Sequence, residues 1–91
     1  MPIFTNNVTL GTAAVEVVSP EILGQEVHLH NMTKSSNEYI YLGGDSAITT
    51  SNTLHIDPGE SITIKLGPGD PLYAFSDPDG LDLGILVVKQ I

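Results

Sequence analysis

Short runs of alternating apolar and polar residues make up most of this chain, and turn signals separate the runs. The clearest segment is 54–70, LHIDPGESITIKLGPGD, in which two alternating runs flank the turn Asp57–Glu60 and a Gly-Pro-Gly-Asp turn follows at 67–70. Pro followed by Gly favours a type II turn, because Pro fixes φ at about −65° and Gly accepts a positive φ. A two-residue period places alternate side chains on opposite faces of a strand. The segment therefore predicts two strands joined by a tight turn, with one face of 61–66 half-buried.

The remaining alternating runs predict further strands at 8–18, 25–32, 38–42, 72–76 and 81–91. Gly11 is typical of a bulge or a turn and divides the first of these runs into two short strands. In the last run both faces become apolar after Gly84, because Leu86 and Val88 follow on the face that begins with a polar residue. This pattern predicts a central strand that is covered on both sides.

About seven or eight short strands separated by turns predict an all-β fold, either a small β-sandwich or a jelly-roll-like barrel of antiparallel strands. A chain of 91 residues forms one domain. We expect an N-terminal arm at 1–7 and a single β-sandwich domain at 8–91. Ser19 and Pro20 suit the N-cap and N1 positions of a helix, so the segment 19–24 predicts at most one helical turn.

The chain is strongly acidic, with a formal net charge of −8 from eleven carboxylates, three lysines and no arginine. Nucleic-acid recognition depends on arginine and on basic patches, and anionic membranes attract basic segments. We therefore expect neither a nucleic acid nor a membrane as a partner. No apolar run approaches the ~18 residues of a membrane span, and no signal-peptide pattern occurs. We expect synthesis in a cytoplasm and a protein that stays soluble.

The chain contains no cysteine, which removes disulfides, thiolate ligands and thiol nucleophiles from consideration. A domain of this size buries only about 60–65% of the surface that its unfolded chain exposes. Its stability is therefore marginal unless something adds to it. Association with further subunits is the remaining source of stability, and an oligomer is expected before any motif is considered.

Three histidines raise the question of a metal site. His28 and His30 project from one face of a predicted strand, and His55 lies on another strand. Convergence of the three side chains would suit a zinc ion, whereas the alternative is that they are polar-face residues of a sheet. No cysteine or carboxylate falls at a supporting spacing. We expect no zinc site.

Three carboxylates, those of Asp77, Asp79 and Asp82, partly match a calcium loop. They lack its twelve-residue frame and its closing bidentate glutamate. A Pro-Asp-Gly turn explains the same segment without a ligand. We expect neither a metal nor another cofactor.

No motif for catalysis or phosphate binding occurs in the chain, which lacks G-x-S-x-G, G-x-G-x-x-G and the P-loop. A small sandwich also offers little cleft for a pair of catalytic carboxylates. We expect a protein without enzymatic activity.

Two features remain as candidates for binding. Tyr39 and Tyr41 lie opposite Ile40 and Leu42 in their strand, and they either cover a sheet or face outward as anchors for a protein or a sugar. The polar loop 43–53 is either solvated or an interaction loop.

Several motifs resemble those of small all-β structural proteins that tailed bacteriophages encode among their virion genes. These proteins carry a strand ending in Y-(I/L/V)-G-G, a Ser/Thr/Asn loop, an L-x-P-G-E turn before an apolar strand, a G-P-G-D or similar turn, and L-Y-A. The corresponding segments here are Tyr41–Gly44, Thr49–Asn52, Ile56–Glu60, Gly67–Asp70 and Leu72–Ala74. The resemblance covers residues 38–76 closely and 8–32 more loosely.

The resemblance implies a capsid decoration protein, which binds the outer surface of the major capsid shell and stabilises it against internal pressure. The partners that it implies are the major capsid protein and further copies of the chain, with a trimer as the expected cluster. Within this chain, the arm and the polar loop are the segments that a single core explains least. We therefore expect the contacts at Ile3, Phe4, Asn6, Asp45, Ser46, Ile48, Thr49, Thr50 and Asn52.

The alternative is a module of a head fibre or a tail that recognises a glycan or a receptor on the host. Its candidate contacts are Tyr39, Tyr41, Asp79 and Asp82.

Overall fold

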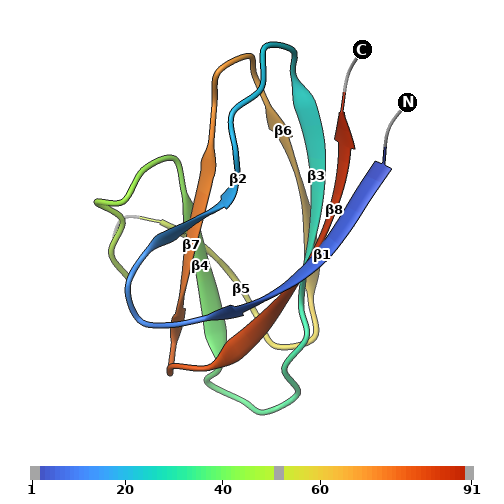
Figure 1. Ribbon diagram of the computed structural model, residues 1–91. Coiled ribbons are helices and arrows are strands. Elements are labelled where there is room, and N and C mark those ends of the chain that lie inside the picture. Colours follow the sequence, from blue (N-terminus) through green and yellow to red (C-terminus); the bar gives the residue numbers. More distant parts are fainter. Residues whose placement is uncertain (1–2, 51–52, 90–91) are drawn as a thin grey trace.

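The computed structural model describes residues 3–50 and 53–89, which form eight strands in two four-stranded sheets (Figure 1). The strands are β1 (Ile3–Leu10), β2 (Val15–Val18), β3 (Gln25–Asn31), β4 (Tyr39–Gly43), β5 (Leu54–Ile56), β6 (Ser61–Leu66), β7 (Leu72–Asp77) and β8 (Leu81–Lys89). The first sheet has the order β1-β8-β3-β6, and the second has the order β2-β7-β4-β5. The all-β sandwich that the alternating pattern predicts is confirmed. Among the described residues, none belongs to a helix that could cross a bilayer.

The strand order is that of a jelly roll. All pairings are antiparallel, and β1 pairs with β8, β2 with β7, β3 with β6 and β4 with β5. The chain is thus one long ribbon of paired strands, with β4 and β5 at its far end. Rolling the ribbon up adds the pairs β3–β8 and β4–β7, which complete the two sheets.

The core lies between the sheets and consists of the alternate, inward-facing residues. In β8 the inward residues are Leu81, Leu83, Ile85 and Val87, all of which are buried. In β3 the same alternation buries Val27 and Leu29 and leaves His28 and His30 exposed. These strands therefore orient their side chains as their period of two predicts.

The two tight turns on either side of β6 are confirmed. Gly59 has φ = 76° and the Glu60 N–H donates to the Asp57 carbonyl at 3.0 Å. Gly69 has φ = 80° and the Asp70 N–H donates to the Gly67 carbonyl at 3.1 Å. Only glycine adopts such positive φ values without strain, which is why each turn has Gly after Pro.

The N-terminal segment differs from the expected arm. Ile3–Leu10 is one strand, and its register with β8 runs without a break from Ile3 opposite Val88 to Leu10 opposite Leu81. Residues 3–7 therefore belong to the sheet, because their backbone continues the same ladder and Phe4 and Asn6 continue the inward alternation of Val8. The first two residues of the expected arm lie outside the described residues.

The segment 19–24 forms no helical turn; it bends as it crosses from β2 in the second sheet to β3 in the first. Its backbone bonds to other segments instead: the Glu21 carbonyl accepts the Gly69 N–H at 2.8 Å. The Ser19 carbonyl accepts a hydrogen bond from Nε2 of the Gln25 side-chain amide at 2.9 Å. These partners replace the bonds that a helical turn would make within the segment.

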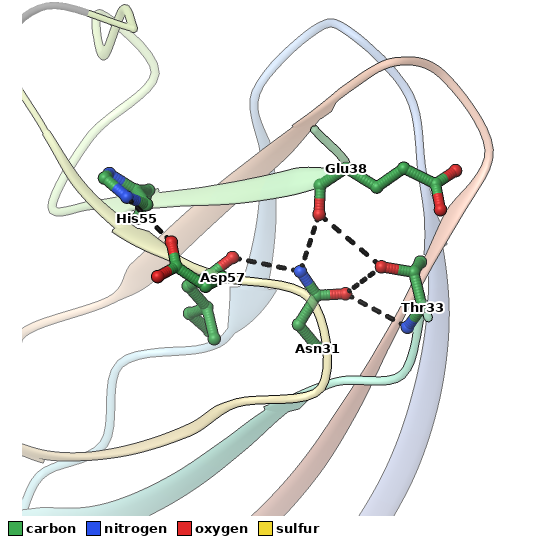
Figure 2. Close-up of polar contacts among 6 residues, drawn as sticks. Asn31, Thr33, Glu38, His55 and Asp57 are labelled. Atoms are coloured by element: carbon green, nitrogen blue, oxygen red, sulfur yellow. Dashed lines mark hydrogen bonds and ion pairs between the residues drawn. The ribbon is translucent and has the colours of Figure 1, made fainter. Parts of the chain in front are cut away.

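A buried asparagine joins the loops at one end of the sandwich (Figure 2). Asn31 is 0% exposed, and its Nδ2 donates to the carbonyls of Glu38 and Ile56, at 2.9 Å each. Its Oδ1 accepts from the backbone N–H of Thr33 at 3.1 Å and from the Thr33 hydroxyl at 2.7 Å. One side chain thus satisfies groups of the β3–β4 loop and of β5.

Replacing Asn31 tests this network. Asn31→Leu removes the donor to the buried Ile56 carbonyl and to the part-buried Glu38 carbonyl, and the acceptor of the two Thr33 donors, so we expect the free energy of unfolding to fall by about 2–4 kcal/mol. Asn31→Asp adds a buried charge that faces both carbonyls, and we expect a loss at least as large. Urea unfolding followed by circular dichroism measures both. Asn37→Asp, the same change in an exposed loop, is the control and should alter stability by less than about 0.5 kcal/mol. Equal effects of the two aspartates would contradict this role of Asn31.

Candidate interaction surfaces

The three histidines do not converge on a metal site. His28 and His30 lie on β3 and face outward from the first sheet, whereas His55 lies on β5 in the second sheet. Among residues 3–50 and 53–89, no group of three or more His, Cys, Asp or Glu side chains is placed to hold a metal ion. The alternative, that the histidines are polar-face residues of their sheets, describes their placement.

His28 and His30 instead line a shallow groove of about 570 Å³ on the outer face of the first sheet. Gly84 of β8 lies in the groove, where the missing side chain makes room for Met32. A Cβ on Gly84 would lie 3.3 Å from the Met32 sulfur. Leu86 lines the groove on the same strand. The groove therefore combines an apolar strip with imidazole, hydroxyl and amide groups.

Hydrogen bonds between strands fix the imidazoles of this groove. His30 Nδ1 is bonded to the Ser61 hydroxyl at 2.8 Å, and His28 Nδ1 to the Thr63 hydroxyl at 3.0 Å. Their partners lie directly opposite on β6 in the strand register. One nitrogen of each imidazole ring is thereby fixed by a hydroxyl group of the neighbouring strand β6.

Among the residues that the structure describes, no carboxylate or ammonium group lines this groove. The nearest acids on this face belong to its margins: Glu26 contacts His28 Nε2 at 3.1 Å, and Asp82 accepts the Thr9 hydroxyl at 2.7 Å. In a chain of net charge −8, the groove is therefore a surface on which another protein meets little repulsion.

The outer face of β8 departs from expectation. The strand is central, between β1 and β3, as its apolar pattern predicts. The second sheet covers only its inward side, however, and Leu86 and Val88 face outward beside Thr5 and Ile3 of β1. These two apolar side chains remain half-buried at the surface of the described chain. The apolar pattern predicts that both faces of β8 are covered, but the second sheet covers only the inward face.

The outer face of the second sheet is covered by aromatic side chains. The rings of Tyr41 and Phe75 stack with centroids 4.9 Å apart, and Phe75 is only 6% exposed. Tyr39 meets the His55 ring edge-on at 5.2 Å. Both tyrosines thus face outward from this sheet and are half-buried among these rings, and their role as contact residues stays a prediction.

The four candidate glycan contacts are not brought into one site. Tyr39 and Tyr41 lie on the outer face of the second sheet. Asp82 lies on the outer face of the first sheet, bonded to Thr9, and Asp79 lies in the turn between β7 and β8. The carboxylates of the partial calcium motif, which include Asp77 at the end of β7, form no metal-binding group among the described residues.

The polar loop between β4 and β5 is partly anchored to its own sheet. Ile48 packs on Gly43, where a Cβ would lie 2.1 Å from Ile48 Cγ2. Asp45 Oδ1 accepts the Ala47 N–H at 2.9 Å. The expected contact residues Asp45, Ser46, Thr49 and Thr50 are exposed, Ile48 is half-buried, and Asn52 lies outside the described residues.

The expected contacts in the N-terminal segment lie on β1, an edge strand of the first sheet. Ile3 and Phe4 are 61% and 51% exposed, and Asn6 is exposed as well. The Lys89 ammonium lies 4.9 Å from the centroid of the Phe4 ring and forms an ion pair with Glu21. These residues are thus presented by a paired strand and not by a separate arm.

Sequence reasoning missed the groove, although two signals for it exist in the chain. Gly84 interrupts an otherwise bulky strand, and after it both faces of the strand carry apolar side chains. A glycine within a strand marks a place where another group approaches closely. Here that group is Met32, and the hollow around it is the groove.

Among the described residues, Glu60 is the ionisable group whose pKa is clearly shifted, and it lies in the turn between β5 and β6. A hydrogen bond with Asp57 and the charge of Asp57 raise the pKa of the Glu60 carboxyl above its ordinary value. His55 Nε2 lies 3.0 Å from Asp57 Oδ1 (Figure 2) and lowers the Glu60 pKa slightly in return. The two acids are held together by the tight turn itself.

Comparisons with known proteins show the fold. The sequence matches no protein-family model and no curated protein. One similar solved structure comes from Bacillus endospore appendages, which form a family of disulfide-linked pili. Its TM-score is 0.63 at 10% identity, over 94% of this chain and 80% of that chain. Another is a pentameric capsid protein from metagenomic phage sequences, with a TM-score of 0.45 at 13% identity, over 93% of this chain and 62% of that chain.

The raised pKa of Glu60 predicts a pH dependence of stability. The folded chain holds this proton more tightly than the unfolded chain, so stability falls as pH rises from the ordinary glutamate pKa, about 4.3, through the raised one. We expect Glu60→Gln to reduce this fall, measured as the urea midpoint at several pH values between about 4 and 6. Glu38→Gln makes the same chemical change outside the turn and should leave the fall in place. An unchanged profile for Glu60→Gln would refute the assignment.

Proposed function

We propose that this chain is a structural protein of a bacteriophage virion that decorates the outer surface of the major capsid shell. It acts by binding alone, without catalysis. The motifs that resemble virion proteins support the proposal, and they occupy defined places in the fold. Tyr41–Gly44 ends β4, Ile56–Glu60 forms the turn before β6, and Gly67–Asp70 forms the turn before β7.

The observation that carries the proposal is the uncovered outer face of the first sheet. Leu86 and Val88 face outward there, and the groove beside them has no charged lining. A central strand that is apolar on both faces is typical of a sheet with cover on both sides. A capsid surface docked on this face would supply the missing cover, and we propose the groove as the site of that contact.

Such a contact would stabilise a shell through mass action. A protein that binds the assembled shell, and not its separated subunits, shifts the equilibrium toward assembly by an amount set by its concentration and affinity. A rigid sandwich that spans two capsid subunits achieves this with buried area only. The likeness to a pilus protein, with a TM-score of 0.63, supports a structural role because that protein places the same fold in an extended assembly.

The test is sedimentation of the purified chain with capsid shells assembled without it. We expect the chain to pellet with the shells. Met32→Asp places a carboxylate in the groove, and desolvating it at the contact should weaken binding at least about tenfold. Ile22→Asp, at a loop position that is 91% exposed and outside the groove, is the matched control and should bind as the natural chain does.

Two results would overturn the proposal. If the natural chain stays in the supernatant at every shell concentration, the capsid is not its partner. If Ile22→Asp weakens binding as much as Met32→Asp does, the groove is not the contact. Circular dichroism of both variants confirms that each one is folded.

A further inference from the structure

The four edge strands of the sandwich differ in how well they are protected against pairing with another chain. β2 has four residues, including Glu16, and a shift in register; β5 has three residues. β6 carries Lys65 on its outward face. Short length, bulges and lysine are the devices by which proteins block edge-to-edge association. Three of the four edges therefore have such a device.

The remaining edge, β1, has none of these devices. It is eight residues long, contains no charged side chain or proline, and keeps a continuous register with β8. Its other side has no strand partner among the described residues. Along that side its backbone N–H and C=O groups can pair with another strand, although the Asn7 N–H donates to Asn6 Oδ1 at 2.9 Å and must exchange that bond if it faces the new strand.

The absence of charged side chains from β1 lets a second copy approach this edge, although the chain as a whole is acidic. Two copies of net charge −8 repel one another over most of their surfaces. The first ionisable side chain in the sequence is that of Glu16, so β1 contributes no carboxylate to the contact. The long neutral edge is where two such molecules can approach with the least repulsion.

We propose that β1 of one copy pairs antiparallel with β1 of a second copy, about a two-fold axis at Asn6. In β1 the even-numbered residues face inward, since Val8 and Leu10 lie opposite Leu83 and Leu81. Residues directly opposite one another in an antiparallel pair point to the same face of the sheet. The cores of the two copies therefore lie on the same side only if even-numbered residues of one β1 lie opposite even-numbered residues of the other. With Asn6 opposite Asn6 of the second copy, Phe4 meets Val8, and the half-exposed Phe4 ring gains an apolar neighbour.

This pairing joins two four-stranded sheets into one continuous sheet, with both grooves on its outer face. The pair is the form of self-association that we assign to the proposed virion protein. Its biological role therefore rests on the proposed function. A two-fold pair replaces the three-fold cluster that the resemblance implies. Its test uses the free protein, so that its failure leaves the capsid experiment unaffected.

A single introduced thiol tests the register, because the chain has no cysteine of its own. Residues directly opposite in an antiparallel pair have Cα atoms about 4.5–5.5 Å apart, within the range that a disulfide spans. We expect Asn6→Cys to give a covalent dimer on mild oxidation, seen on a non-reducing gel. In Thr9→Cys the two thiols are offset by roughly 20 Å along the strands and should not cross-link. Equal cross-linking of both variants, or none at Asn6, would overturn the proposal.

A charge variant tests the contact without a covalent trap. Asn6→Asp places two carboxylates opposite one another at the axis, and we expect the dimer dissociation constant in sedimentation velocity to rise at least about tenfold. Asn37→Asp adds the same charge in an exposed loop and should leave the dimer intact. A monomeric natural chain, assemblies larger than two, or equal effects of both aspartates would each contradict the pairing.

Discussion

The position of β8 between β1 and β3 is the constraint on which the fold depends. The last strand of the chain pairs with the first and with the third, and its inward side chains fill the space under the second sheet. Among the described strands, β1 pairs only with β8, and without β8 the strand β3 would keep β6 as its one neighbour in this sheet. These pairings link residues far apart in the sequence, so the ribbon must be nearly complete before its core closes.

The local pattern was sufficient for the strands, their faces and their turns. Period-two alternation identifies buried residues such as Leu29 without knowledge of the partner strand, and Pro-Gly pairs identify turns from their own φ requirements. Strand order is a different matter, because it is decided by contacts between distant segments. The sequence therefore could not tell that His55 belongs to one sheet and His28 to the other.

The sequence contains two further signals, one at Asn31 and one in the first strand, 3–10. Asn31 falls on the inward face of its strand, in line with Val27 and Leu29, and an asparagine at that position is typical of a satisfied polar group in a core. Residues 1–7 are predicted as an arm because termini are rarely ordered unless they are tied down. An edge strand has a neighbour on one side only, so more of its side chains stay exposed and its apolar alternation is weaker, as the exposed residues 3–7 show.

The two outer faces of the sandwich are unlike one another. Aromatic rings and Ile48 cover the second sheet, whereas the first sheet leaves its apolar strip open. The β4–β5 loop belongs to the covered side, and its ends are held together because Leu42 lies opposite Leu54. A foreign peptide spliced into this loop would enter between two strands already in register. In the capsid contact that we propose, the first sheet faces the shell, so a peptide inserted in this loop would extend from the other sheet of the sandwich.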